Sequence, residues 1–339
     1  MKKYILALES SCDETACAIV DLDGKLYSNI VSSQIDVHTK YGGVMPEIAS
    51  RLHIENINFV IKEALEQASI NMDEIVAIAV TSGPGLIGAL HVGLQAAKTL
   101  ALTLNVPLIS VHHLLGHIYA NSFTKEIEFP CLALVVSGGH TELVYMKEEL
   151  DFKIIGSTVD DAIGEAYDKV ARIVGLGYPG GPKIDKASKL GKVTYNMPHP
   201  KVSGKYDVSY SGLKTYCNNL VHNNAQKGIE TNVNDLCASF QARAVEMIVD
   251  KVLNAVDEYE VKQVVVAGGV AANSYLREKI VTEMNKKHKD IDIVVPPLWA
   301  CGDNAAMIAK ASLPLYKRGL FATLDLSAKP SWSIEDFIK

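Results

Sequence analysis

Paired cysteines are absent from this sequence of 339 residues. The six cysteines are scattered at positions 12, 17, 131, 217, 237 and 301, and no C-x-x-C pair occurs. The N-terminus, MKKYILALESSCDE, reaches acidic residues before a secretory hydrophobic region could form. These absences argue against a disulfide framework and against secretion. We therefore expect a cytoplasmic protein with free thiols.

Long apolar runs and an excess of basic charge are also missing. The longest stretch without formal charge, 75–97, is broken at Ser82-Gly83-Pro84-Gly85 into a short strand and the start of a helix, so we expect no membrane span. With 33 Lys and Arg against 39 Asp and Glu, the net charge of −6 argues against a generally basic nucleic-acid binder. The hydrophobic share of 48% suffices for the cores of two ordinary domains.

Neither G-x-x-x-x-G-K-[ST] nor a well-fitting dinucleotide fingerprint is present, which argues against an ordinary P-loop ATPase. Three other glycine turns have the composition of anion sites: 137–141, 177–182 and 268–273. Glycine lets backbone N–H groups approach an anion, and the last turn joins a buried strand to a helix N-terminus. Each turn alone also suits a hairpin or a helix cap. Their number favours an anion site.

Apolar periodicity predicts an α/β fold that repeats itself. Runs at 4–8, 16–20 and 26–32 predict an antiparallel meander, followed by a helix at 46–69, a strand at 75–80, a helix from about 88 and a strand at 107–111. The pattern restarts at 131–146, with a helix within 156–176 and a strand, glycine turn and helix at 262–277. We expect two similar lobes with a cleft between them, the first formed by 1–127 and 305–339 and the second by 128–304.

The stretch VHHLLGH, 111–117, places His113 and His117 on one helix face, as metal ligands often are. The alternative is one capping or core histidine and one exposed histidine. Asp303, at the start of an Ala-rich helix, is either a third ligand or a helix N-cap. Two histidines and a carboxylate would leave coordination positions open for a substrate. The Glu that follows the first His in metalloproteases is absent.

Two charged segments have both a functional and a structural interpretation. The turn at 9–15 carries Glu9, Asp13 and Glu14, which form either a solvated turn or a site for proton transfer. The segment 183–205 carries six lysines against the single acid Asp185, so it is either an ordinary solvated surface or a path for a phosphate backbone.

Nine stretches together resemble the bacterial tRNA N6-adenosine threonylcarbamoyltransferases: ESSCDETA, MPEIASRLH, VHHLLGH, VVSGGHTEL, EAYDKVAR, GYPGGPKID, SYSGLKT, VVAGGVAAN and CGDNAAM. The resemblance implies duplicated actin-like, ribonuclease H-like lobes with mixed sheets, as in sugar kinases, actin and heat-shock chaperone ATPases. It implies transfer of a threonylcarbamoyl group from threonylcarbamoyl-AMP to the N6 amine of the adenosine 3′ of the anticodon, in tRNAs reading ANN codons.

The resemblance also implies a set of site residues. His113, His117 and Asp303 match the ligands of one divalent metal, with Fe²⁺ favoured over Zn²⁺. The positions that match the adenylate-binding residues are Val136, Ser137, Gly138, Gly139, His140, Asp168, Gly181, Asp185 and Asn273. For the proton leaving the attacking amine, we expect Asp13 or Glu14 to act as the base. The implied partners are tRNA, a smaller inactive paralogue and a small ATPase, with 46–69 either docking a partner or packing on its own sheet.

Two other classes of function remain open at this point. One is a metal-dependent peptidase, against which the missing Glu counts. The other is an ATPase switch that binds partners by lobe closure, against which the histidine pair counts, because such proteins hold Mg²⁺ through phosphates and carboxylates.

Overall fold

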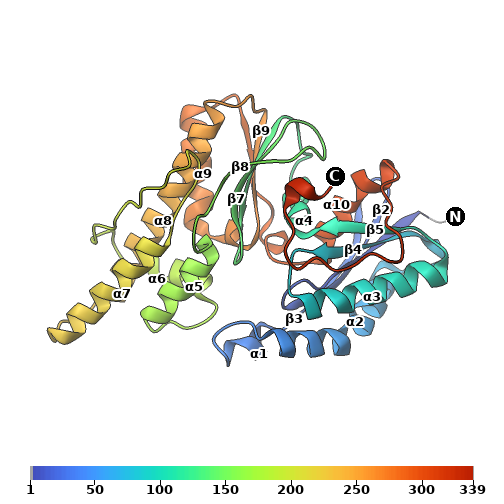
Figure 1. Ribbon diagram of the computed structural model, residues 1–339, viewed down its shortest axis with the longest axis horizontal. Coiled ribbons are helices and arrows are strands. Elements are labelled where there is room, and N and C mark those ends of the chain that lie inside the picture. Colours follow the sequence, from blue (N-terminus) through green and yellow to red (C-terminus); the bar gives the residue numbers. More distant parts are fainter. Residues whose placement is uncertain (1–2, 339) are drawn as a thin grey trace. The chain divides into compact units, whose positions relative to one another are not determined.

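The computed structural model describes residues 3–338 (Figure 1). The chain forms two compact units. The first runs to Phe123 and resumes at Pro297, and the second is Thr124–Pro296. The structure thus changes unit at 123/124 and 296/297, whereas the sequence analysis placed these changes at 127/128 and 304/305.

The sheet of the first unit has the strand order β3-β2-β1-β4-β5. β1 (Tyr4–Glu9), β2 (Glu14–Asp21) and β3 (Leu26–Ser33) are antiparallel, and β4 (Ile75–Gly83) and β5 (Leu108–His112) continue the sheet in parallel with β1. β1 is buried throughout, which explains its continuous apolar sequence. The predicted meander is confirmed.

Helices enclose this sheet: α1 (Ile35–Thr39), α2 (Pro46–Ala68), α3 (Ile87–Leu104), α4 (His113–Tyr119) and α10 (Ala305–Lys317). α2 begins at Pro46, which has no N–H to leave unpaired in the first turn. Val60 of α2 and Leu94 of α3 pack with Leu6 and Ile78 of the sheet in one core cluster. α10 returns from the end of the chain to contact β1, β2 and α4, which brings the segment before α10 to the histidines.

α3 is long and apolar enough to cross a membrane by length and composition. The core helix of a globular protein meets the same test, and Leu90, Leu94 and Ala97 of α3 are buried in the first unit.

The second sheet repeats the first, with the strand order β10-β9-β6-β7-β8. β6 (Cys131–Val136), β7 (Thr141–Met146) and β8 (Lys153–Ser157) are antiparallel, and β9 (Gln263–Ala267) and β10 (Asp292–Val294) run parallel to β6. Each sheet is therefore a three-stranded meander extended from its first strand by two parallel strands. This shared topology confirms the duplication that the sequence pattern predicts.

The helices of the second unit are α5 (Ile163–Ile173), α6 (Gly180–Ser188), α7 (Ser211–Gln226), α8 (Val233–Val256) and α9 (Ser274–Lys287). The helix expected within 156–176 occupies only its second part, because residues 156 and 157 complete β8. The glycine turn at 177–182 ends as the first turn of α6, and the turn at 268–273 leads through a short 3-10 helix into α9. Both turns thus lie at helix N-termini.

Candidate active site

The first unit brings the three predicted metal ligands together. His113 and His117 lie in α4, and Asp303 lies two residues before α10. One ligand atom of each lies within 4.8 Å of the other two. Nε2 of His117 is 3.1 Å from Oδ1 of Asp303, and Nε2 of His113 is 3.5 Å from the same oxygen. Residues almost 190 positions apart in the sequence therefore form one cluster.

Both histidines are buried, with exposed fractions of 8% for His113 and 1% for His117, so the alternative of one exposed histidine is wrong. Neither ring nitrogen of His117 makes a hydrogen bond within the described residues. A buried imidazole without such a partner is costly, and a cation beside Nε2 would compensate for that cost. The donor set and the buried ring therefore fit a divalent metal.

Asp303 is not the cap of α10, contrary to one of the two interpretations from sequence. Asn304 is the cap, because its Oδ1 accepts the N–H of Met307 at 3.0 Å. Likewise His112 caps α4 by accepting the N–H of Leu114, which leaves His113 available. The capping residues next to His113 and Asp303 thus relieve these two ligands of a structural hydrogen bond.

Glu9 at the end of β1, one of the three acids noted in the turn 9–15, contacts His113, which the sequence analysis did not predict. It is fully buried, and its Oε2 lies 3.3 Å from Nδ1 of His113 and accepts the hydroxyl of Thr81 at 2.5 Å. Because a carboxylate only accepts, Nδ1 of His113 carries a proton toward Glu9, and Nε2, which faces Asp303, is the nitrogen that a metal would take. The signal was the first acid of the motif ESSCDE, which carries three acids in six residues.

The charges of this cluster shift the pKa values of its members. Burial would raise the pKa of Glu9, but the charge and hydrogen bond of His113 outweigh burial and lower that pKa. Burial would lower the pKa of His113, but the charges of Asp303 and Glu9 outweigh it and raise the pKa to about 9. Asp303 and Glu9 thus stabilise positive charge at His113.

Of the predicted bases, Asp13 lies in the loop between β1 and β2, and Glu14 is the first residue of β2. Asp13 is buried, and Glu14 accepts the hydroxyl of Ser33 at 3.0 Å. Burial raises the pKa of Glu14 to about 10, with further contributions from the charges of Asp303 and Asp13. Because two of these causes are negative charges, a cation bound at Asp303 would oppose the shift.

His53 of α2 holds this loop in place. Its Nδ1 lies 2.7 Å from the hydroxyl of Thr15 and its Nε2 3.0 Å from the carbonyl oxygen of Cys12, and the ring is fully buried. The motif MPEIASRLH therefore has a local role, because its last residue fixes the backbone that carries Asp13 and Glu14.

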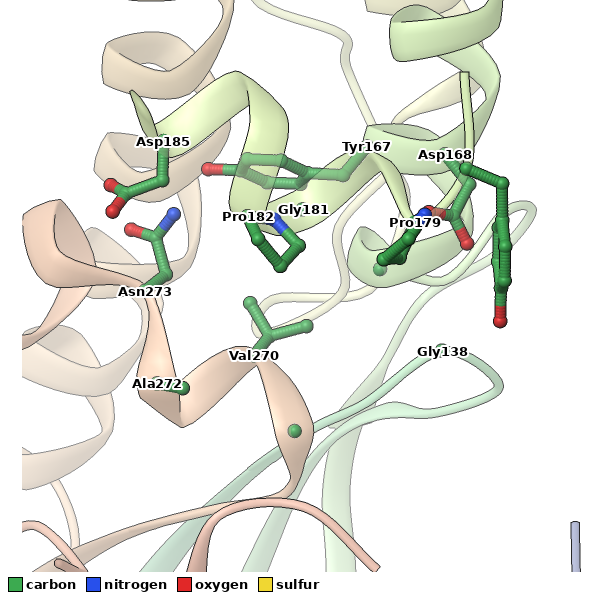
Figure 2. Close-up of a pocket in the computed structure, with 13 residues that line it drawn as sticks. Gly138, Tyr167, Asp168, Pro179, Gly181, Pro182, Asp185, Val270, Ala272 and Asn273 are labelled. Atoms are coloured by element: carbon green, nitrogen blue, oxygen red, sulfur yellow. The ribbon is translucent and has the colours of Figure 1, made fainter. Parts of the chain in front are cut away.

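The second unit contains a cavity of about 450 Å³ (Figure 2). Five of the nine predicted adenylate positions line it: Gly138, Asp168, Gly181, Asp185 and Asn273. Figure 2 shows Asp185 and Asn273 facing one another at one end, with Asp168 toward the other and Pro182 and Val270 between them. The cavity is therefore apolar in its middle and polar at its ends, as nucleotide-sized ligand sites usually are.

The other four predicted positions do not line this cavity: Val136, Ser137, Gly139 and His140. They build the turn that carries Gly138. The hydroxyl of Ser137 accepts the N–H of His140 at 3.0 Å, and the carbonyl oxygen of Ser137 accepts the N–H of Gly164 at 3.2 Å. The adenylate role of these four residues stays a prediction, whereas Gly138 lines the cavity.

The glycines in and next to the cavity fall into two kinds. A Cβ on Gly180 would lie 2.6 Å from the Cα of Asp168, and the N–H of Gly180 donates to the carboxylate of Asp168 at 2.6 Å. Glycine is needed there for packing. A Cβ on Gly138 or Gly181 would meet no atom within 4 Å, although both residues line the cavity. At these two positions the missing side chain leaves open space at the cavity, which a ligand can occupy.

Comparison with known proteins supports the family resemblance that the sequence motifs indicate. Residues 25–310 match the family model of tRNA N6-adenosine threonylcarbamoyltransferase. Proteins of that name from Listeria welshimeri and Bacillus anthracis are 54% and 53% identical over 339 and 332 residues. The alignments cover 99% and 98% of this chain and 98% and 96% of those proteins.

Solved structures of lower identity share the fold. HypF from T. kodakarensis is 16% identical with a TM-score of 0.63, over 96% of this chain and 49% of that one. Component A of the (R)-2-hydroxyglutaryl-CoA dehydratase from Acidaminococcus fermentans is 15% identical with a TM-score of 0.55, over 94% of this chain and all of that one. The duplicated actin-like fold is thus confirmed. Since the family model and the relatives match nearly the whole length, the chain belongs to the tRNA N6-adenosine threonylcarbamoyltransferase family.

Proposed function

We propose that this enzyme takes the threonylcarbamoyl group from threonylcarbamoyl-AMP and transfers it to the N6 amine of the adenosine 3′ of the anticodon, in tRNAs reading ANN codons. The family assignment gives the transferred group and the accepting amine. The cavity of the second unit is the observation that supports an adenylate as the donor. Its size and polar ends suit a nucleoside, and its glycines leave space for a ligand.

Within that cavity, each residue has a proposed part in binding. Asp185 and Asn273 provide polar atoms for the hydroxyl groups of the sugar. Val270 and Pro182 provide apolar surface for the base (Figure 2). Gly138 allows the backbone to approach the phosphate, because an anion is best bound by N–H groups without a side chain in the way.

We propose one divalent metal at His113, His117 and Asp303, with Fe²⁺ or Zn²⁺ as the candidates that suit two nitrogens and a carboxylate. When bound, the metal would act as a Lewis acid on an oxygen of the donor. The chain contributes the ligands, and Glu9 fixes the ring of His113 so that Nε2 faces Asp303.

The acceptor amine is a poor nucleophile because its lone pair is delocalised into the adenine ring, so the proton that it loses needs a base. Asp13 and Glu14 are the proposed candidates, and His53 contacts Cys12 and Thr15 on either side of them. The donor is activated already, and attack by water would waste it. Leu114, the position after the first histidine, is buried and cannot activate water, which also argues against a metallopeptidase.

We further propose that the enzyme acts in the cytoplasm with a smaller inactive paralogue and a small ATPase. α2 is the proposed docking element, because Ile54 and Phe59 on this helix are 63% and 57% exposed. Its buried face, which includes Val60, packs on the sheet as the alternative interpretation expects.

A direct assay tests the reaction. The metal-loaded protein, with its partner proteins, is incubated with threonylcarbamoyl-AMP and a tRNA with adenosine 3′ of its anticodon, and the digested nucleosides are examined by mass spectrometry. We expect the threonylcarbamoyl mass on adenosine, and none with guanosine at that position. Casein and ATP alone serve as parallel substrates. Casein cleavage would support a peptidase, and ATP turnover without transfer would support an ATPase switch.

A further inference from the structure

Gln241 of α8 lies behind the polar end of the cavity and does not line it. Its side chain is 2% exposed. Nε2 donates to Oγ of Ser188 at 2.8 Å and to Oδ1 of Asp185 at 3.3 Å. Oε1 accepts from Nδ2 of Asn273 at 2.8 Å and from the hydroxyl of Tyr167 at 3.4 Å. One buried amide thus joins the two polar residues that face the ligand space.

The groups at the two ends of this hydrogen-bond chain, Asp185 and Asn273, determine which atoms donate and which accept along it. Asp185 at one end is a carboxylate, which only accepts, so the NH₂ group of Gln241 must face it. At the other end, Oδ1 of Asn273 accepts the N–H of Leu276 at 2.9 Å as the cap of α9. The NH₂ group of Asn273 must therefore face Oε1 of Gln241. Neither amide can flip without breaking these bonds.

Each of the two facing residues retains hydrogen-bonding capacity for a ligand. The NH₂ group of Asn273 has two hydrogens, and one is used by Gln241. The carboxylate of Asp185 can accept about four hydrogen bonds. Three donors use it: Gln241, Lys189 and the hydroxyl of Ser274, which has a single proton and therefore counts once although it lies near both oxygens. The cavity wall therefore offers one donor beside one acceptor.

We propose that Gln241 is a positioning residue that makes this end of the cavity selective for a ligand with two adjacent hydroxyl groups. Such a diol donates one proton to Asp185 and accepts one from Asn273. Without Gln241, only the N–H of Leu276 would hold the Asn273 amide and Asp185 would lose one donor, so both groups would be less fixed toward the diol and the selectivity would fall. This inference rests on the proposed adenylate site, since the sugar of an adenylate carries such a diol.

A purely structural role would have a different consequence. Gln241 also links α8 to Ser188 at the end of α6, so its loss could loosen the whole cavity. Loosening would weaken every ligand of the cavity equally, whereas loss of positioning would weaken only ligands that carry the hydroxyl groups. Two nucleotides that differ in these groups alone separate the two roles.

The test uses calorimetry on the full chain with AMP and 2′,3′-dideoxy-AMP. We expect the wild type to prefer AMP by about tenfold, the factor that one or two hydrogen bonds are worth. Gln241→Met keeps the volume of the side chain but cannot donate or accept as Gln does, and we expect it to lose most of this preference while its affinity for the dideoxy analogue changes little. Gln226→Met, at an exposed glutamine of α7, is the matched control and should keep the preference.

Since Gln241 is buried, Gln241→Met could fail to fold, and a second variant at the same position keeps the test decisive. Gln241→Asn keeps the amide but is too short to reach both Asn273 and Ser188, so we expect a smaller preference than in the wild type. Either variant retaining the full preference, or losing affinity equally for both nucleotides, overturns the inference. If the wild type binds AMP and 2′,3′-dideoxy-AMP equally well, the inference about Gln241 is wrong but the proposed adenylate site still stands. A wild type that binds neither nucleotide overturns the adenylate site as well.

Discussion

At the scale of single residues, one of two adjacent residues caps a helix while the other contacts the metal-ligand cluster. Asn304 caps α10 and Asp303 faces the histidines, and in the same way His112 caps α4 while His113 points to Glu9. In both cases a polar side chain that satisfies the helix end leaves its neighbour available for another ligand.

Asp303→Asn should abolish metal binding and leave stability nearly unchanged. An amide is a much poorer metal ligand than a carboxylate, and the helix cap at Asn304 is untouched. Asn304→Ala is the matched control, and it should lower the free energy of unfolding by about 1 kcal/mol because it removes the cap, while it retains the metal. Metal analysis and urea unfolding measure the two effects. If Asn304→Ala lost the metal and Asp303→Asn retained it, Asn304 would be the ligand and Asp303 would not.

Gly138→Val should weaken AMP binding by about tenfold or more without loss of metal or stability. The added side chain would meet no protein atom at its Cβ, so it would occupy ligand space only. Gly139→Val is the control, because its Cβ also meets no atom within 4 Å but the residue does not line the cavity. Calorimetry decides between them, and equal affinities of the two variants would make the turn a simple hairpin.

Sequence reasoning found residues by their type and spacing, and it missed those that act through others. His113 and His117 show a helical spacing, and the glycines of the cavity lie in short turns. Glu9 was noted only as one of three acids in its turn and Gln241 was not noted at all, because their partners lie 104 residues away at His113 and 32 residues away at Asn273. Only the folded chain brings such partners within hydrogen-bonding distance.

At the scale of elements, the strands were predicted best because buried strands have continuous apolar sequences. β1, β4 and β9 are buried over nearly their whole length. The starts of α2 and α3 were also predicted to within one residue, but α6 was not predicted, since it begins inside a turn of glycines and proline. Such residues are poor helix formers, and the carboxylate of Asp168, which accepts the N–H of Gly180, stabilises this start.

The start of α7 depends on a carboxylate from another element. Asp160, between β8 and α5, accepts the hydroxyls of Ser209 and Ser211 and the N–H of Tyr210. Burial would raise the pKa of Asp160, but these hydrogen bonds outweigh burial and hold it below its ordinary value. A lowered pKa stabilises the fold above the unfolded pKa of about 3.9, and this contribution is lost as the pH falls further.

Replacing both hydroxyl donors should therefore destabilise the protein at neutral pH more than in acid. We expect Ser209→Ala with Ser211→Ala to lower the thermal midpoint at pH 7, and the gap from the wild type to shrink below about pH 4, where Asp160 gains a proton. Ser203→Ala, at an exposed serine of the same segment, is the control. A gap of the same size at both pH values would contradict this role for Asp160.

At the scale of the whole molecule, an acidic protein must bind an acidic tRNA. The segment 183–205 is the local exception to the net charge of −6. Its lysines differ in their surroundings, however. Lys183 donates to the carbonyl oxygens of Leu176 and Tyr178, Lys189 pairs with Asp185, and Lys205 pairs with Glu258. Lys186, Lys192 and Lys201 are exposed, and no carboxylate among residues 3–338 pairs with them.

We therefore expect the triple variant Lys186→Ala, Lys192→Ala and Lys201→Ala to weaken all substrate tRNAs about equally, because contacts with phosphates do not depend on base sequence. Affinity for AMP should stay unchanged, since Lys189, the lysine that pairs with Asp185 at the cavity, is retained. Each lost phosphate contact should also flatten the dependence of log affinity on log salt by roughly one unit, because fewer counterions are released on binding.

The measurement is tRNA affinity at several salt concentrations, with the partner proteins present. A parallel triple variant at Lys286, Lys287 and Lys289 tests the competing basic surface at the end of α9. A flatter slope in the first variant alone places the tRNA along 183–205. A flatter slope in the second variant alone moves the path to α9, and unchanged slopes in both mean that a partner subunit supplies the phosphate contacts, because the tRNA must release its counterions to some basic surface.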